Sequence, residues 1–266
     1  MKKPLRVKMI TIGDPEVGKS CIIKRYCEKR FVSKYLMTIG IDYGVTKSVT
    51  NGRATKLNIF DMSGHPAFYE VRREFYPDTN CILLIFDSSS KDSFRNLDSW
   101  YEEAKREIGG DSNLSKVQCI LCANKIDKNR NVPAVDGKNW AAIHGFMYAE
   151  CSAFDGTGVN ELFDLVFSTA TEAFENGGKL ASKPPANSVG YSKEDLETVE
   201  KIISASDNFE RLGLNSYKTT EDDVKKAYRK LAGVVHPDKC AAPRSEEAFK
   251  LLNQAKVSLL SRLDTK

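Results

Sequence analysis

A glycine-rich loop between an apolar run and a helical pattern does most to limit what this chain can fold into. Residues 13–20 read Gly-Asp-Pro-Glu-Val-Gly-Lys-Ser, directly after the apolar run Leu5–Ile12 and at the start of a helical pattern over Lys19–Glu28. The backbone amides of such a loop can surround phosphate oxygens, and the N-terminus of the following helix favours an anion. A chance glycine turn is the alternative, but the order strand, loop, helix favours a phosphate-binding loop.

The remaining pattern up to residue 176 alternates strands with helices. Continuous apolar runs at Cys81–Phe86 and Val117–Ala123 predict strands that are buried on both faces. Val45–Val49 and Lys56–Phe60 flank Asn51-Gly52, which is typical of a hairpin. Helical patterns separate these strands and cover Lys91–Glu107, Gly137–His144 and Val159–Glu175. The alternation predicts an α/β fold with a mostly parallel sheet, flanking helices and one antiparallel hairpin.

The composition is that of an ordinary globular protein with room for more than one domain. The chain has 266 residues, of which 41% are hydrophobic, and roughly 150 residues per domain predict about two domains. Lys and Arg (40) barely exceed Asp and Glu (36), and a net charge of +4 argues against a nucleic-acid partner. Seven scattered cysteines without a secretory segment indicate reduced thiols. Cys119 and Cys122 have Cys-x-x-Cys spacing, but their apolar strand favours core packing over zinc or redox chemistry.

The sequence predicts no membrane anchor. Met1–Pro4 matches neither a signal peptide nor a myristoylation site, and the run Cys81–Phe86 is too short to span a bilayer. Residues 261–266 contain no cysteine that could be prenylated. We therefore expect a soluble monomer in the cytoplasm, the nucleus or both.

The strand–helix alternation ends at residues 177–190. This stretch combines Gly177-Gly178 and Pro184-Pro185 with small polar residues, and it predicts a flexible linker. Only helical patterns follow. The expected organisation is an α/β domain over 1–176, the linker, a connecting helix over 191–205 and a small all-α domain over 206–266.

Capping-box patterns mark the starts of two of these helices. Ser192 with Asp195 precedes a helix over 192–205, and Thr220 with Asp223 precedes a helix over 221–235. A third helix is expected over about Ser245–Ser261. The apolar face of the first helix must pack on one of the domains, and the sequence does not decide which.

A second motif in the α/β domain selects the base of a nucleotide. Asn124-Lys125-Ile126-Asp127 follows the strand Val117–Ala123, at the sheet edge where the phosphate-binding loop also lies. The Asp127 carboxylate can accept hydrogen bonds from N1–H and the N2 amino group of guanine, whereas adenine would leave it unpaired. Lys19 adds charge near the β- and γ-phosphates, and the Ser20 hydroxyl can bind Mg²⁺. These residues predict a site for GTP or GDP with Mg²⁺.

With these motifs, the segment from Leu5 to Asn176 resembles the small GTPases of the Ras superfamily, the Rab branch most closely. The resemblance implies a P-loop GTPase fold with a six-stranded, mostly parallel sheet. It also implies that Thr38 and Gly64 respond to the γ-phosphate, that Asp61 holds Mg²⁺ through water, and that Phe31 lies beside guanine. The implied nucleotide-binding residues are Gly13, Glu16, Val17, Gly18, Lys19, Ser20, Cys21, Phe31, Thr38, Asp61, Gly64, Asn124, Lys125, Asp127, Ser152 and Ala153, with Ser20, Thr38 and Asp61 serving the metal.

Two residues depart from the family pattern where hydrolysis is expected. His65 replaces the glutamine that orients the attacking water in the family. A histidine can act as a general base, and the alternative is that another residue supplies this role. Pro15 removes an N–H and adds bulk close to where an activating arginine would enter. We expect GTP binding with slow or atypical hydrolysis, and His65 is the candidate catalytic residue.

The segment from Asp207 to Lys266 resembles a J domain, the partner module of DnaK-type heat-shock chaperones, as found in subfamily C of the DnaJ proteins. Asp207–Leu214, Lys225–Ala232 and the segment from Ala248 are similar to its three helices, and His236-Pro237-Asp238 is its signature tripeptide. No client-binding extension is recognisable. The resemblance implies a chaperone-binding surface that comprises Lys225, Lys226, Arg229, Lys230, His236, Pro237 and Asp238. Without the tripeptide, the basic face would indicate a solvated surface or a weak nucleic-acid patch.

Together these features predict a GTP-controlled co-chaperone. It would recruit and stimulate a DnaK-type chaperone ATPase and bind an effector protein through the segments around Thr38 and Gly64. One alternative is a constitutively GTP-loaded signalling scaffold whose J domain is secondary. Another is a signalling GTPase with a vestigial J domain.

Overall fold

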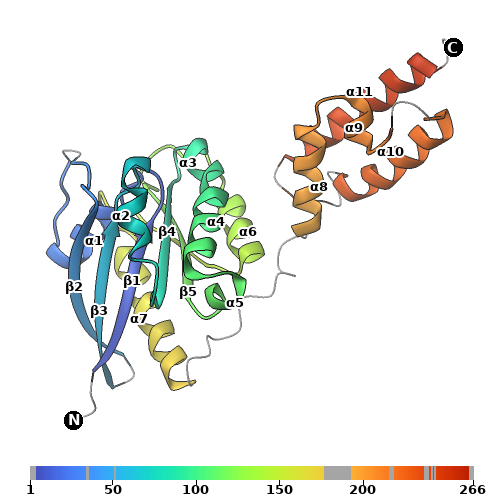
Figure 1. Cartoon of the computed structure of the whole chain (residues 1–266). Coiled ribbons are helices and arrows are strands. Elements are labelled where there is room, and N and C mark those ends of the chain that lie inside the picture. Colours follow the sequence, from blue (N-terminus) through green and yellow to red (C-terminus); the bar gives the residue numbers. More distant parts are fainter. Residues whose placement is uncertain are drawn as a thin grey trace. The chain divides into compact units, whose positions relative to one another are not determined.

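The chain folds into two units, and each has its own core. The core of the first lies between a sheet and its helices, and the core of the second lies among helices. In this computed structural model the two units are Met1–Pro184 and Pro185–Lys266 (Figure 1). The structure describes residues 4–33, 36–50, 52–176, 193–215, 219–236, 240, 242 and 244–263. The predicted linker over 177–190 and the predicted chaperone-binding residues Pro237 and Asp238 lie outside the described residues.

A six-stranded sheet in the order β2-β3-β1-β4-β5-β6 is the centre of the first unit. Only β2 and β3 pair antiparallel, which confirms the predicted mostly parallel sheet with one hairpin. Every residue of β4 and β5 is buried, because helices cover both faces of these strands. The strands are β1 (Leu5–Ile12), β2 (Ile41–Thr50), β3 (Arg53–Met62), β4 (Cys81–Asp87), β5 (Gln118–Asn124) and β6 (Met147–Glu150).

Helices cover the two faces of this sheet. One hydrophobic cluster joins it to α1 (Lys19–Glu28) and α7 (Val159–Glu175), and a second joins it to α4 (Leu97–Ile108) and α6 (Ala134–His144). Shorter helices lie in the connections: η1 (Pro66–Phe68), α2 (Tyr69–Arg73), α3 (Lys91–Arg95) and α5 (Asp111–Leu114). Because these strands run parallel, their carboxyl ends lie at one edge of the sheet, where the connecting loops can meet.

The prediction of one continuous helix over Lys91–Glu107 is wrong. The chain forms α3 and α4 instead, and Asn96 both ends the first helix and begins the second. The Asn96 side chain makes no capping hydrogen bond and instead donates to the Asp14 carboxylate at 2.7 Å. The break lets α4 place Leu97, Trp100 and Ala104 in the core.

Four described helices form the second unit: α8 (Lys193–Ser204), α9 (Asn208–Leu212), α10 (Glu221–Val235) and α11 (Ser245–Leu263). α8 contacts each of the other three helices and buries Val199 and Ile202 among them. Arg211 of α9 fixes the C-terminal end of α8, because its guanidinium donates to the carbonyls of Ile202 at 3.0 Å and Ala205 at 2.9 Å. The helix expected over 192–205 thus packs within the helical unit. None of the described helices has the length and apolar character needed to cross a membrane.

Candidate nucleotide site and helical module

The phosphate-binding loop (residues 13–20, hereafter the P-loop) closes around the ammonium group of Lys19. The Lys19 Nζ donates to the carbonyls of Gly13 and Asp14, each at 2.8 Å. Burial lowers the pKa of Lys19 to about 8, although nearby carboxylates oppose this shift. Gly18 has a left-handed φ of 96°, and a Cβ there would lie 2.3 Å from the Asn124 Nδ2, so only glycine fits. The loop thus holds its cation at the sheet edge, and the ammonium has a third N–H that can bind a phosphate.

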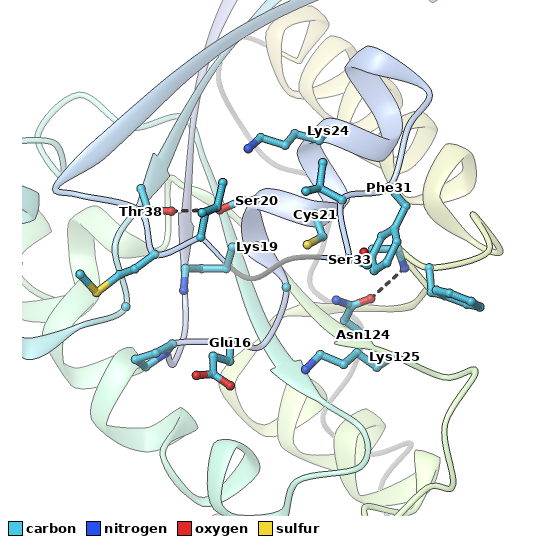
Figure 2. A pocket seen from close by; sticks show the side chains of 18 of the residues that line it. Glu16, Lys19, Ser20, Cys21, Lys24, Phe31, Ser33, Thr38, Asn124 and Lys125 are labelled. Atoms are coloured by element: carbon cyan, nitrogen blue, oxygen red, sulfur yellow. Dashed lines mark hydrogen bonds between the residues drawn. The ribbon is translucent and has the colours of Figure 1, made fainter.

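A cavity of about 290 Å³ opens beside the P-loop and gathers most of the predicted nucleotide-binding residues. In Figure 2, Ser20 and Thr38 lie together on one side of the pocket, and Phe31 lies near Asn124 and Lys125 on the other. Four predicted residues lie behind the lining: Gly13, Val17, Asp61 and Ser152. The predicted residues in the lining are Glu16, Gly18, Lys19, Ser20, Cys21, Phe31, Thr38, Gly64, His65, Asn124, Lys125, Asp127 and Ala153.

Oxygen ligands that suit Mg²⁺ gather at the phosphate end of this pocket. The Ser20 Oγ lies 3.0 Å from the Thr38 Oγ1. Behind them, the buried carboxylate of Asp61 accepts a hydrogen bond from the Thr11 hydroxyl at 3.0 Å. Burial raises the pKa of Asp61, and the Ser20 hydroxyl and the Lys19 charge oppose that shift. Hydroxyl and carboxylate oxygens are the donors that Mg²⁺ prefers, so the residues present fit this ion.

Hydrogen bonds orient the residues at the base end of the pocket. The Ser152 hydroxyl donates to the Asp127 carboxylate at 2.7 Å, which leaves the other carboxylate oxygen available. The Asn124 side chain donates to the carbonyl of Val17 at 2.8 Å and accepts from the Ala153 N–H at 3.1 Å. Ser152 and Val17 therefore act as supports for the groups that face the base.

Three further side chains shape the base end and were not predicted. Arg25 of α1 donates from Nε to the carbonyl of Ala153 at 2.8 Å. The Asp87 carboxylate lies 2.7 Å from the Lys125 Nζ. Burial alone would raise the pKa of Asp87, but Lys125 and hydrogen bonds from a neighbouring serine hold it below its usual value. Phe154, 60% exposed, adds an aromatic ring to the pocket wall. Only Phe154 had a signal in the sequence, because it directly follows a predicted base-contacting motif.

His65, the candidate catalytic residue, turns its ring toward its own chain. The Nδ1 accepts a hydrogen bond from the Ala67 N–H at 3.2 Å and so caps η1. A neutral ring that accepts at Nδ1 carries its proton on Nε2. Neither nitrogen is then left to take a proton from water. In this arrangement His65 is a capping residue, and general-base catalysis would require the ring to turn.

The predicted chaperone-binding residues lie on and just after α10. Lys226, Arg229 and Lys230 are exposed, and Lys225 pairs with Glu221 at 2.9 Å. His236 directly follows the helix, and its ring lies 5.0 Å from the Phe249 ring of α11, centroid to centroid. The Tyr228 hydroxyl donates to the Asn253 side chain of α11 at 2.7 Å. α10 and α11 thus form a tied pair that presents a basic face and an anchored histidine.

The two units define a class of protein. A P-loop, an oriented aspartate that fits guanine and a mostly parallel sheet are the parts of a small GTPase, and the tied helix pair is that of a J domain. Residues 8–172 match the Ras family, and residues 207–264 match the DnaJ domain. The chain therefore belongs to the Ras family and carries a DnaJ domain. A Ras-family domain implies guanine-nucleotide binding and effectors, and a DnaJ domain implies a heat-shock chaperone partner.

Similar proteins align with this chain over nearly its whole length. The chain is 52% identical over 264 residues to DnaJ homolog subfamily C member 27 of Danio rerio, which covers 98% of this chain and 96% of that protein. The proteins of the same name from Rattus norvegicus and Homo sapiens are 51% and 50% identical, each covering 98% of this chain and 95% of the relative. Each of these alignments thus spans both domains of this chain.

Proposed function

We propose that this protein is a guanine-nucleotide switch that controls a J-domain co-chaperone. In this proposal the J domain recruits a DnaK-type heat-shock chaperone and stimulates its ATPase, and the GTPase domain binds an effector protein. One observation supports the proposal: a pocket lined by P-loop residues and Asp127 and a helix pair with an exposed basic face occur in a single chain.

The pocket residues divide the recognition of GTP between them. The P-loop amides and Lys19 would bind the phosphates, and Asp127 would select guanine. Ser20 and Thr38 would hold Mg²⁺ directly, with Asp61 behind them acting through water; the ion supplies positive charge at the phosphates. The γ-phosphate would order the segments around Thr38 and Gly64, which form the effector surface of the proposal. Hydrolysis to GDP would release this order.

The helical unit would bring in the chaperone. The exposed cations of α10 can steer association with an acidic surface. His236, at the end of this helix, would then act with the rest of its tripeptide on the bound ATPase. In this proposal the GTPase domain would select the clients through its effector surface.

Two experiments test the proposal with the full chain. The first compares how well the GTP-bound and GDP-bound forms retain a partner, which tests the switch. The second measures the ATPase rate of a DnaK-type chaperone, which tests the J domain. We expect a partner that the GTP-bound chain retains and the GDP-bound chain releases. His236→Gln should abolish ATPase stimulation without changing nucleotide binding. Lys250→Ala, which removes an exposed cation from α11, is the control and should stimulate normally. Equal retention in both nucleotide states would refute the switch, and full stimulation by His236→Gln would refute the co-chaperone role.

A constitutively GTP-loaded scaffold is the second candidate. The observation that favours it is the His65 ring, whose Nδ1 is already occupied by the Ala67 N–H. Slow hydrolysis would keep the protein in its GTP form, and the J domain would then be secondary. The rate of single-turnover GTP hydrolysis separates this candidate from the switch.

We further infer a monomer that acts in the cytoplasm, the nucleus or both. The thiols support a reducing compartment, since none of the seven cysteines forms a disulfide and five are buried. Light scattering of the purified chain and cell fractionation check the two parts of this inference.

A further inference from the structure

The segment after β3 lies directly against the P-loop at Gly64. A Cβ on Gly64 would lie 2.4 Å from the Gly13 carbonyl oxygen and 2.6 Å from backbone atoms of Asp14 and Pro15. Only a residue without a side chain can approach the loop this closely. The position of the Gly64 amide relative to the P-loop is therefore set by whatever holds the two backbones together.

α4 and the residue before it hold the P-loop side of this contact. The Asp14 carboxylate accepts one hydrogen bond from the Trp100 Nε1 and one from the Asn96 Nδ2, both at 2.7 Å. The two donors satisfy different carboxylate oxygens, so they fix the orientation of the Asp14 side chain. Trp100 is nearly buried, which makes this a rigid support.

Arg72 of α2 holds the other side of the contact to the same helix. Its Nη1 donates to the carbonyls that flank Gly64, at 3.0 Å for His65 and 3.5 Å for Ser63. Its Nε and Nη2 donate to the two carboxylate oxygens of Glu103 on α4, at 2.6 and 2.7 Å. Arg72 is only 5% exposed. One buried guanidinium thus joins both neighbours of Gly64 to α4.

The surroundings of this ion pair leave it little freedom. The guanidinium lies 4.8 Å from the centre of the Trp100 ring, and the buried Tyr76 hydroxyl donates to the Glu103 carboxylate at 2.7 Å. The planar guanidinium of Arg72 donates hydrogen bonds in two directions at once. Lysine cannot reproduce this, because its ammonium is a compact point charge. Removing either charge would leave the other buried without its partner.

We propose that Arg72 is a positioning residue for the γ-phosphate, which sets the distance of the Gly64 amide from the P-loop and so favours GTP over GDP. This inference rests on the proposed nucleotide function and names a determinant of its switch. GDP has no γ-phosphate, and its α- and β-phosphates are bound by the P-loop itself. Loss of Arg72 should therefore weaken GTP binding selectively.

The test compares the affinities of the full chain for GDP and for a non-hydrolysable GTP analogue. We expect Arg72→Gln to lower the GTP-to-GDP affinity ratio about tenfold, a usual size for coupling between two sites, with the GDP affinity unchanged. Arg72→Lys should behave like Arg72→Gln. Arg73→Gln is the matched control, because its neighbouring pair with Glu70 is exposed, and it should leave both affinities unchanged.

A spectroscopic readout separates positioning from a loss of fold. The chain has two tryptophans, so Trp140→Phe leaves Trp100 as the sole indole. We expect the GTP analogue to shift Trp100 emission more than GDP does, and Arg72→Gln to remove this difference. Glu103→Gln gives a second route to the same result if Arg72→Gln does not fold.

Each outcome decides between the proposals. If the unaltered chain binds neither nucleotide, the proposed nucleotide function fails. If it binds both, and Arg72→Gln or Glu103→Gln lowers the two affinities equally or not at all, the nucleotide function stands and the role of Arg72 is overturned. A selective loss of GTP affinity supports the role.

Discussion

His65 shows how the neighbours of a residue can decide its chemistry. The sequence placed it where the family has a water-orienting glutamine, and it left open whether the imidazole takes over that role. The structure uses the ring as a cap for η1, through the Ala67 N–H. A glutamine in the same place has a longer reach and both donor and acceptor atoms. It could therefore orient a water in a way that the capped ring does not.

We expect His65→Gln to raise the rate of single-turnover GTP hydrolysis by roughly 100-fold, the lower range of what a positioned acid–base side chain contributes. Rapid quench of preloaded GTP measures this rate. His65→Ala is the companion variant, and it should hydrolyse GTP no more slowly than the unaltered chain because the ring only caps. A clear loss of rate in His65→Ala would show that the ring acts in the reaction.

At the scale of elements, local signals predicted where helices begin better than where they break. The capping box before α10 is present as predicted: the Asp223 N–H donates to the Thr220 hydroxyl at 3.3 Å, and the Thr220 N–H donates to the Asp223 carboxylate at 3.0 Å. The break between α3 and α4 was missed. The Asn96 side chain there bonds Asp14, which is remote in sequence, so no local pattern could reveal it.

Thr220→Ala should lower the free energy of unfolding of the helical unit by about 1 kcal/mol, because it removes an N-cap acceptor. Hydrogen exchange of the α10 amides in the full chain measures this change, with the loss greatest in the first turn. Thr220→Ser keeps the hydroxyl and should retain most of the stability. An equal loss in both variants would mean that the methyl group, and not the cap, stabilises the helix start.

At the scale of the whole molecule, α8 belongs to the core of the helical unit. Its apolar face could have packed on either domain as far as the sequence showed. The structure buries Val199 and Ile202 against the other helices and ties the helix end through Arg211. The helical unit therefore contains one more packed helix than the J-domain resemblance implied.

Ile202→Ala should destabilise the helical unit by about 3 kcal/mol, because it leaves a cavity at a position that is 2% exposed. Calorimetry of the full chain with and without GDP assigns the transitions. GDP should raise only the GTPase transition, by about 2.7 kcal/mol at a hundredfold excess over Kd. Ile202→Ala should lower only the other transition, and a fall in the GDP-sensitive one would contradict the placement of α8.

The sequence by itself determined five of the six described strands in the first unit, the P-loop and the guanine motif. These are local patterns: burial on both faces makes continuous apolar runs, and a phosphate cradle needs glycines at fixed spacing. Tertiary structure alone decided that Arg72 and Asp14 meet at α4, that Arg25 supports Ala153, and that α8 packs in the helical unit. Those contacts join residues from different elements, and the periodicity of the sequence does not predict which partner a side chain will contact.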